Sequence, residues 1–280
     1  MRLRLAGSAV ALSLGVAACV PDLAAAHGLV ARGDLPIPQW LFAWGATLVL
    51  VASFVALAAL WRTPRLERPP AGRRVARIPG WVDAVCALIG VALFGLVVYS
   101  GLFGAQSVAR NLAPTFVYVL FWVGVAPLSA VLGDVFRAFN PWRAIARAGA
   151  WALSRIGRAP SGALLAYPEW LGRWPAAVGL LGFVWLELVS ADSQDPRLVA
   201  VLALIYAAIQ LVGMALFGIE RWSDRGDAFG VYFNLFARLS PLVRRGADVY
   251  LTRPLSRLAG LTSVPGTLAL LFVMIGSTSW

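Results

Sequence analysis

The sequence offers few side chains for metal or redox chemistry. It contains one histidine, His27, and two cysteines, Cys19 and Cys86. This excludes a bis-histidine haem, an iron–sulfur cluster and a Cys/His zinc site built from this chain alone. All 24 basic residues are arginines, which also excludes a lysine Schiff base and a phosphate-loop lysine. The candidates singled out below are carboxylates, arginines and His27.

Glu187 is the acidic residue placed furthest inside an apolar stretch. A charge at the centre of a membrane helix costs roughly 2.5–3.5 kcal/mol, so such residues usually face a cavity or a partner. One interpretation is an outward-facing site in which Glu187, Asp192 and Arg32 are catalytic and His27 and Glu187 bind a metal. The alternative is a structural Glu187 that is protonated or paired.

A second set of acids follows the fifth apolar stretch. Glu220, Asp224 and Asp227 would share one helix face by their spacing, and Asp134 precedes another polar segment. Such carboxylates can bind Mg²⁺, Ca²⁺ or Mn²⁺. Because arginines alternate with them, a salt-bridge network is the favoured interpretation.

The N-terminus has the features of a secretory signal peptide, assigned to residues 1–26. Arg2 and Arg4 precede an apolar run of 16 residues, and Ala24–Ala26 form a cleavage motif. Cleavage there would expose His27, whose amine and imidazole could together bind copper. The alternatives are a lipidated Cys19 after a lipobox-like sequence, an uncleaved signal anchor, and an ordinary terminal histidine.

The composition predicts an all-α, polytopic membrane helix bundle. Hydrophobic residues make up 60% of the 280 residues, charged residues only 13%, and mean hydropathy is +0.77. We predict that residues 27–280 form one membrane domain with six transmembrane helices. They lie near residues 40–61, 82–103, 115–133, 174–190, 198–218 and 258–275.

Arginine placement predicts the orientation. The loops 62–80, 134–173 and 219–257 contain six, six and seven arginines, whereas the opposite side has only Arg32 and Arg110 with Arg197. The positive-inside rule makes those loops cytoplasmic, with the mature N-terminus outside the plasma membrane. The net charge of +11 then reflects topology and contact with membrane lipids, not nucleic acid. The protein partners left open are another membrane subunit and a second copy of the chain.

Two cytoplasmic segments are predicted to be more than connectors. Asn140 and Pro141 suit the start of a helix, and the following residues have an apolar and a basic side. This predicts a basic interfacial helix on the cytoplasmic side. The stretch 229–242 is apolar but too short to span, and it is predicted to be interfacial or re-entrant.

Four segments together resemble a known family. They are AHGLVARGDLPIPQWLFAW at 26–44, NLAPTFVYVLFWVG at 111–124, GDVFRAFNPWRA at 133–144 and ERWSDRGDAFGVYFNLFARLSP at 220–241. They resemble an actinobacterial family of integral membrane proteins labelled fenitrothion hydrolases. Members continue beyond a sixth span, so the resemblance implies that this chain matches the N-terminal part of a longer protein.

The resemblance implies hydrolysis of organophosphate triesters. A water activated by a carboxylate and a divalent metal ion would attack phosphorus and expel a phenolate. The alternative function is a non-enzymatic transporter or copper-handling membrane subunit, with His27 and Glu187 as ligands.

Overall fold

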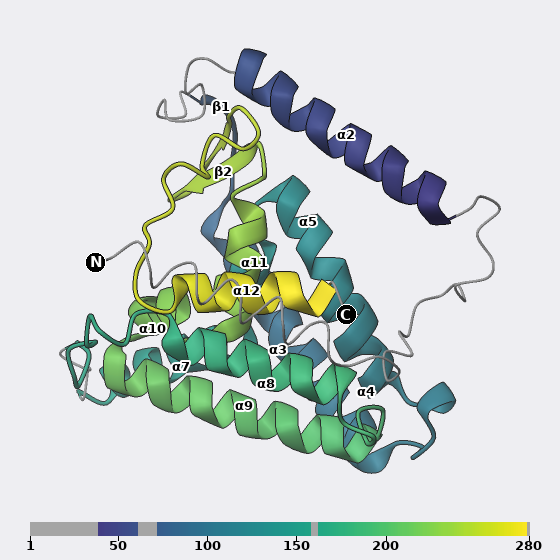
Figure 1. Ribbon diagram of the computed structural model, residues 1–280. Helices are drawn as coiled ribbons and strands as arrows, with labels where there is room; N and C mark the ends of the chain where they lie inside the picture. Colours follow the sequence, from purple (N-terminus) through teal and green to yellow (C-terminus); the bar gives the residue numbers. More distant parts are fainter. Residues whose placement is uncertain (1–38, 61–71, 158–161, 279–280) are drawn as a thin grey trace, which may run out of the picture. The chain divides into compact units, whose positions relative to one another are not determined.

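The computed structural model describes residues 39–60, 72–157 and 162–278 (Figure 1). The chain divides into two compact units, residues 1–62 with 279–280, and residues 63–278. The described part of the first unit is helix α2 (Gln39–Leu60), 22 residues without a charge, which matches the first predicted span. The predicted signal peptide, His27 and Arg32 lie outside the described residues.

The second unit is mostly helical, as the sequence predicts. Its elements, in chain order, are β1 (Arg73–Arg77), α3 (Gly80–Phe103), η1 (Val108–Arg110), α4 (Leu112–Thr115), η2 (Phe116–Gly124), α5 (Val125–Leu132), α6 (Val135–Phe139), α7 (Pro141–Arg155), α8 (Trp174–Leu188), α9 (Pro196–Phe217), α10 (Ile219–Arg225), α11 (Ala228–Ala237), β2 (Leu242–Arg245), β3 (Asp248–Leu251) and α12 (Thr267–Thr278).

Within the described residues, three helical segments are long and apolar enough to cross a membrane. They are Gly80–Phe103, Leu112–Leu132 and Pro196–Phe217. Large apolar side chains such as Phe103 and Val212 are exposed along them. An apolar surface of this extent would be costly in water and indicates association with a membrane. The other apolar helices of the second unit, including α8 with 15 residues, are shorter than the about 20 residues of a full span.

The second of these segments is not a continuous α-helix. Residues 116–124 form the π-helix η2, between α4 and α5. Pro127 follows it and has no N–H with which to continue the regular hydrogen-bond ladder. π-Helices are rare. The short π segments that occur inside α-helices are often found at functional sites.

The last predicted span is shorter than its hydropathy indicates. Residues 258–275 were predicted to be helical, but α12 begins only at Thr267. Pro265 disfavours helical backbone at the residue before it. Gly266 has φ +80°, and a Cβ there would overlap the backbone of Arg173 and Trp174. The Pro-Gly pair therefore directs the chain against the start of α8, and α12 then packs along α8 (Figure 1).

A small antiparallel sheet, in the order β1-β3-β2, was not predicted. Arg73 pairs with Leu251, and Arg245 pairs with Asp248 across the β2–β3 hairpin. Strands β1 and β2 are rich in arginine, and all three strands lie in the predicted loops, where hydropathy carries no strand pattern. Arg244 binds both carboxylate oxygens of Asp83 at 2.5 and 2.7 Å, which connects the sheet to α3.

Helix α11 lies in the protein core. Its residues Phe233 and Ala237 are fully buried, and it packs against α5, α6 and α8. The apolar stretch 229–242 was predicted to be interfacial or re-entrant, but its first half is an internal helix. Burial within the protein therefore explains its composition.

Gly90 allows α3 to approach the end of α6. A Cβ at this buried position would overlap the carbonyl oxygen of Phe139, whereas a Cβ at Gly95 of the same helix meets nothing within 4 Å. This contact positions α6 and the start of α7 beside α3.

We expect Gly90→Ala to lower the free energy of unfolding by about 1–3 kcal/mol, because the backbone of α6 must move. Gly95→Ala is the matched control. It should be neutral or stabilising by up to about 1 kcal/mol, the helix-propensity gain. Unfolding of the two detergent-purified variants measures the difference. Equal stabilities would contradict the close approach.

Candidate functional site

A fully buried carboxylate, Asp227, joins three helices. Its Oδ2 accepts hydrogen bonds from Asn140 Nδ2 and Trp142 Nε1, both at 2.8 Å. Its Oδ1 accepts from the Tyr206 hydroxyl at 2.8 Å and from the backbone N–H of Gly230 at 3.1 Å. Asp227 is thus the N-cap of α11 and also binds the start of α7 and the middle of α9.

The surroundings of Asp227 favour a structural role. Burial raises the pKa of this carboxyl, and the hydrogen bonds from neutral donors act against that shift. The sequence placed Asp227 on one helix face with Glu220 and Asp224, which is wrong. Helix α10 ends at Arg225, and the turn after it directs Asp227 into the core.

Glu220 and Asp224 form the salt-bridge network that the sequence favours. Glu220 accepts from Arg137, Arg143 and Arg147 at 2.5 to 2.8 Å, and Asp224 accepts from Arg137 at 2.5 Å. Partial burial opposes ionisation of Glu220, but the arginines, led by Arg143, hold its pKa below the usual value. The network connects α10 with α6 and α7.

The predicted helix after Asn140 is confirmed as α7. The Asn140 side chain accepts from the backbone N–H of Arg143 at 3.0 Å, and Pro141 occupies the first turn. Arg143 and Arg147, expected to face lipid headgroups, instead bind Glu220.

Next to Asp227 lies a cavity of about 510 Å³. Its lining comes from seven α-helices and from the π-helix η2. It contains no charged residue among the described positions. The lining residues are Gly90, Leu93, Phe94, Val97, Phe116, Val117, Tyr118, Leu120, Phe121, Val125, Val135, Phe136, Phe139, Pro141, Trp142, Gly179, Gly182, Phe183, Trp185, Leu186, Val199, Leu202, Ala203, Ile205, Tyr206, Ile209 and Phe229.

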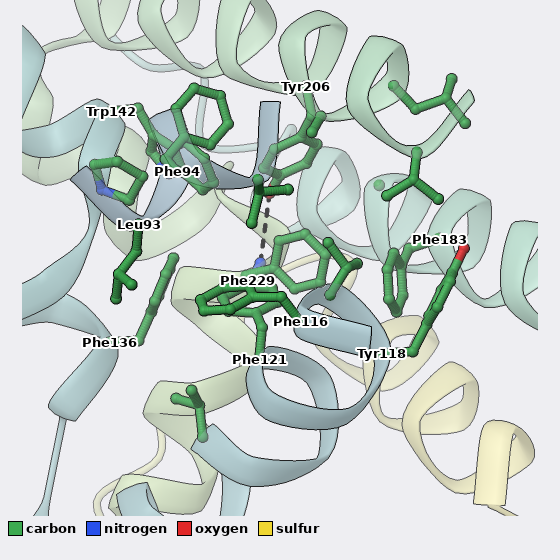
Figure 2. Close-up of a pocket in the computed structure, with 18 of the residues that line it drawn as sticks. Leu93, Phe94, Phe116, Tyr118, Phe121, Phe136, Trp142, Phe183, Tyr206 and Phe229 are labelled. Atoms are coloured by element: carbon green, nitrogen blue, oxygen red, sulfur yellow. Dashed lines mark hydrogen bonds between the residues drawn. The ribbon is translucent and has the colours of Figure 1, made fainter. Parts of the chain in front are cut away.

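Many of the lining side chains are aromatic (Figure 2), and we call this space the aromatic cavity. Phe229 meets Phe121 at 4.8 Å and Phe183 at 5.0 Å between ring centroids, both edge to face. Phe121 and Phe136 pack in the same way at 5.4 Å. Rings in this arrangement present both edges and faces to a bound molecule.

Three of the polar side chains in the lining direct their hydrogen-bond donors away from the cavity. Tyr206 and Trp142 direct their donors to Asp227, and the Tyr118 hydroxyl donates to the carbonyl of Ser193 at 2.8 Å. The cavity therefore presents apolar ring surface to its contents.

The cavity opens at the apolar surface of the protein. Among its lining residues, Trp185 is 58% exposed, and Ile205 and Ile209 are more than half exposed. Leu120 of η2 is also more than half exposed, so η2, α8 and α9 contribute to the rim, and η2 and α9 belong to segments long enough to cross a membrane.

Of the predicted catalytic residues, Glu187 and Asp192 are described. Glu187 lies half-buried on α8, one turn beyond Phe183, and its charge acts on the hydroxyls of Tyr118 and Tyr232. It makes no hydrogen bond or ion pair within the described part of the chain. Asp192 is exposed in the turn between α8 and α9, and no described contact joins it to Glu187.

Metal ligands are not gathered in the described part of the chain. No group of three or more His, Cys, Asp or Glu side chains there could hold a metal ion. Glu187 and Asp192 alone do not make a metal site, and His27 lies outside the described residues. The divalent metal that the resemblance implies thus finds no ligand set among these positions.

Comparisons with models of protein families, with curated proteins and with solved structures find no similar protein. The function is therefore inferred from the geometry of the site. Sequence reasoning missed the aromatic cavity because its lining comes from many segments, each of which reads as ordinary core or membrane helix. The density of aromatic residues at 116–122 was the available indication.

We expect Asp227→Ala to lower the free energy of unfolding by at least about 3 kcal/mol. The change leaves the donors of Asn140, Trp142 and Tyr206 buried without an acceptor, each at about 1–3 kcal/mol. Asp224→Ala, three residues away and half-exposed, should cost only about 0–1 kcal/mol. Denaturant unfolding in detergent compares the two variants. A similar loss of unfolding free energy in both would show that the buried hydrogen bonds of Asp227 do not stabilise the fold more than a surface ion pair does.

Proposed function

We propose that this chain is an integral membrane protein that binds a neutral, aromatic small molecule in the aromatic cavity. The observation that carries the proposal is an uncharged, ring-lined cavity that opens on apolar surface. Its volume of about 510 Å³ lies within the roughly 300–1,000 Å³ of small-molecule sites.

The lining defines the chemistry of the ligand. A charged molecule would lose its hydration and find no partner in the cavity, which is strongly unfavourable. Aromatic pairs contribute about 0.5–1.5 kcal/mol beyond burial, so rings such as Phe121 and Phe229 favour an aryl group over an alkyl chain. The donors of Tyr206 and Trp142 are bound to Asp227, so shape and ring contacts provide the recognition.

The route of entry follows from the rim. Because Trp185 and Ile209 lie on apolar surface, the ligand is taken from the bilayer and not from water. The three long apolar helices support a membrane location, and we propose that this membrane is the plasma membrane. We further propose the six-span topology with the arginine-rich loops in the cytoplasm and α7 on the inner membrane surface, supported by the arginine asymmetry.

Reversible binding of a neutral aromatic molecule taken from the bilayer is what a transporter requires, so we propose a transporter as the first candidate function. A second candidate, hydrolysis of neutral aryl phosphotriesters, is favoured by Glu187. This half-buried acid has no hydrogen-bond partner among the described residues and lies one turn from Phe183 of the lining. As a general base it would take a proton from water, whose oxygen bonds to phosphorus while the bond from phosphorus to the aryl oxygen breaks and phenolate leaves.

The binding proposal is tested with radiolabelled fenitrothion, a neutral aryl phosphotriester, on protein in nanodiscs with empty nanodiscs as the blank. We expect the radiolabel to bind in a saturable way. Naphthalene should compete with it for the cavity, whereas hexadecane should not. Gly182→Leu places a side chain at the lining and should weaken binding about tenfold or more, the effect of about 1.4 kcal/mol of lost contact. Gly95→Leu, outside the cavity, is the control. Binding that is not saturable, or equal in both variants, would refute the proposal.

Hydrolysis is tested by nitrophenolate release from the same compound. If Glu187 is the base, Glu187→Gln lowers the rate at least about tenfold while binding persists. Glu169→Gln, an exposed acid paired with Arg225, should keep the wild-type rate. Saturable binding without release identifies a carrier, and an unchanged rate in Glu187→Gln removes this residue from the mechanism.

A further inference from the structure

Three arginines meet around the loop that connects β3 to α12. Arg173 precedes α8, Arg238 ends α11, and Arg257 lies in the loop itself. All three are partly buried. They are far apart in the sequence, and the fold brings them to one region that the aromatic cavity does not include.

The three side chains are held by backbone carbonyls. Arg238 Nη1 donates to the carbonyl of Arg257, and Arg257 Nη1 donates to that of Ala237, both at 3.2 Å. Arg173 Nη1 donates to the carbonyl of Thr262 at 3.1 Å and to Thr267 Oγ1 at 3.0 Å. These bonds fix the guanidinium groups and leave most of their donors unused, since each group has five.

No carboxylate pairs with these arginines within the described part of the chain. The acids nearby are already engaged: Glu169 with Arg225, and Asp224 with Arg137. The Asp134 carboxylate accepts from Asn234 and from the N–H of Arg137, and acts on Arg257 only through its charge.

Arg238 lies within the electrostatic influence of both other arginines. Burial lowers the pKa of Arg238, and the charges of Arg257 and Arg173 lower it further. In addition, the Nε atoms of Arg173 and Arg238 are buried with no hydrogen-bond partner. Because these Nε atoms are inaccessible, an anion would accept from the Nη groups instead, where it would offset the crowding of partly buried positive charge.

We propose that Arg173, Arg238 and Arg257 bind a phosphate group. A phosphate offers several oxygens around one centre, and the planar fork of arginine binds such oxygens in pairs. The same chemistry is present in the headgroup of an anionic phospholipid and in free phosphate. The proposal does not depend on the ligand of the aromatic cavity.

The test measures thermal unfolding of the full chain in an uncharged detergent. One arm adds inorganic phosphate against chloride at equal ionic strength. The other adds phosphatidylglycerol against phosphatidylcholine. We expect one of the two phosphate sources to raise the Tm of the wild type in a saturable way. Arg238→Gln and Arg257→Gln should each weaken the apparent affinity about tenfold or more.

The matched control is Arg253→Gln, which removes the same charge from an exposed arginine in the same loop and should change the affinity less than about twofold. A shift with phosphate alone identifies a soluble anion, and a shift with phosphatidylglycerol alone identifies a lipid headgroup. No shift with either source overturns the proposal. So does an equal loss in Arg253→Gln and Arg238→Gln. If one glutamine variant does not fold, the wild-type titrations still show whether a phosphate group binds. Arg173→Gln then shows whether it binds at these arginines.

Discussion

The buried carboxylate of Asp227 is the interaction on which the second unit depends. It caps α11, fixes the start of α7 through Asn140 and Trp142, and holds α9 through Tyr206. Among the described residues its partners are neutral donors, so the carboxylate is satisfied without a counter-charge. Asn140, Trp142 and Tyr206 all donate to this one carboxylate. The relative positions of the three helices therefore depend on a single side chain. Such a network is stable only when every member is paired, which gives it a single arrangement.

The aromatic cavity follows from this anchor. The rings of Trp142 and Tyr206 line it because their polar ends are drawn to Asp227 on the other side. The π-helix η2 contributes Phe116 and Phe121, among others, and Gly90 lets α6 come close enough to close the wall with Phe136. The cavity is therefore apolar in its interior while the polar atoms of its wall stay hydrogen-bonded, as a buried polar group requires.

Two groups of arginines have different physical roles. Arg137, Arg143 and Arg147 neutralise Glu220 and Asp224 and join α7 to α10. Arg173, Arg238 and Arg257 have backbone partners but no acid among the residues that the structure describes. The positive-inside rule treats both groups alike, since it counts charges by loop. Their partners in space separate structural arginines from those that can bind an anion.

The sequence alone determined the helical class, the apolar segments and the Asn140 cap of α7, because these depend on composition, periodicity and neighbours along the chain. It also favoured salt bridges for Glu220, but only the tertiary structure supplies their partners, Arg137, Arg143 and Arg147, from distant segments. The short start of α12, the small sheet, the inward turn of Asp227 and the aromatic cavity were decided by tertiary structure. Each depends on contacts between residues distant in the sequence: Gly266 against Trp174, Arg73 beside Leu251, and Asp227 among donors from two other helices. Hydropathy identifies Phe121 and Phe229 as apolar, but only packing decides that their rings surround a cavity.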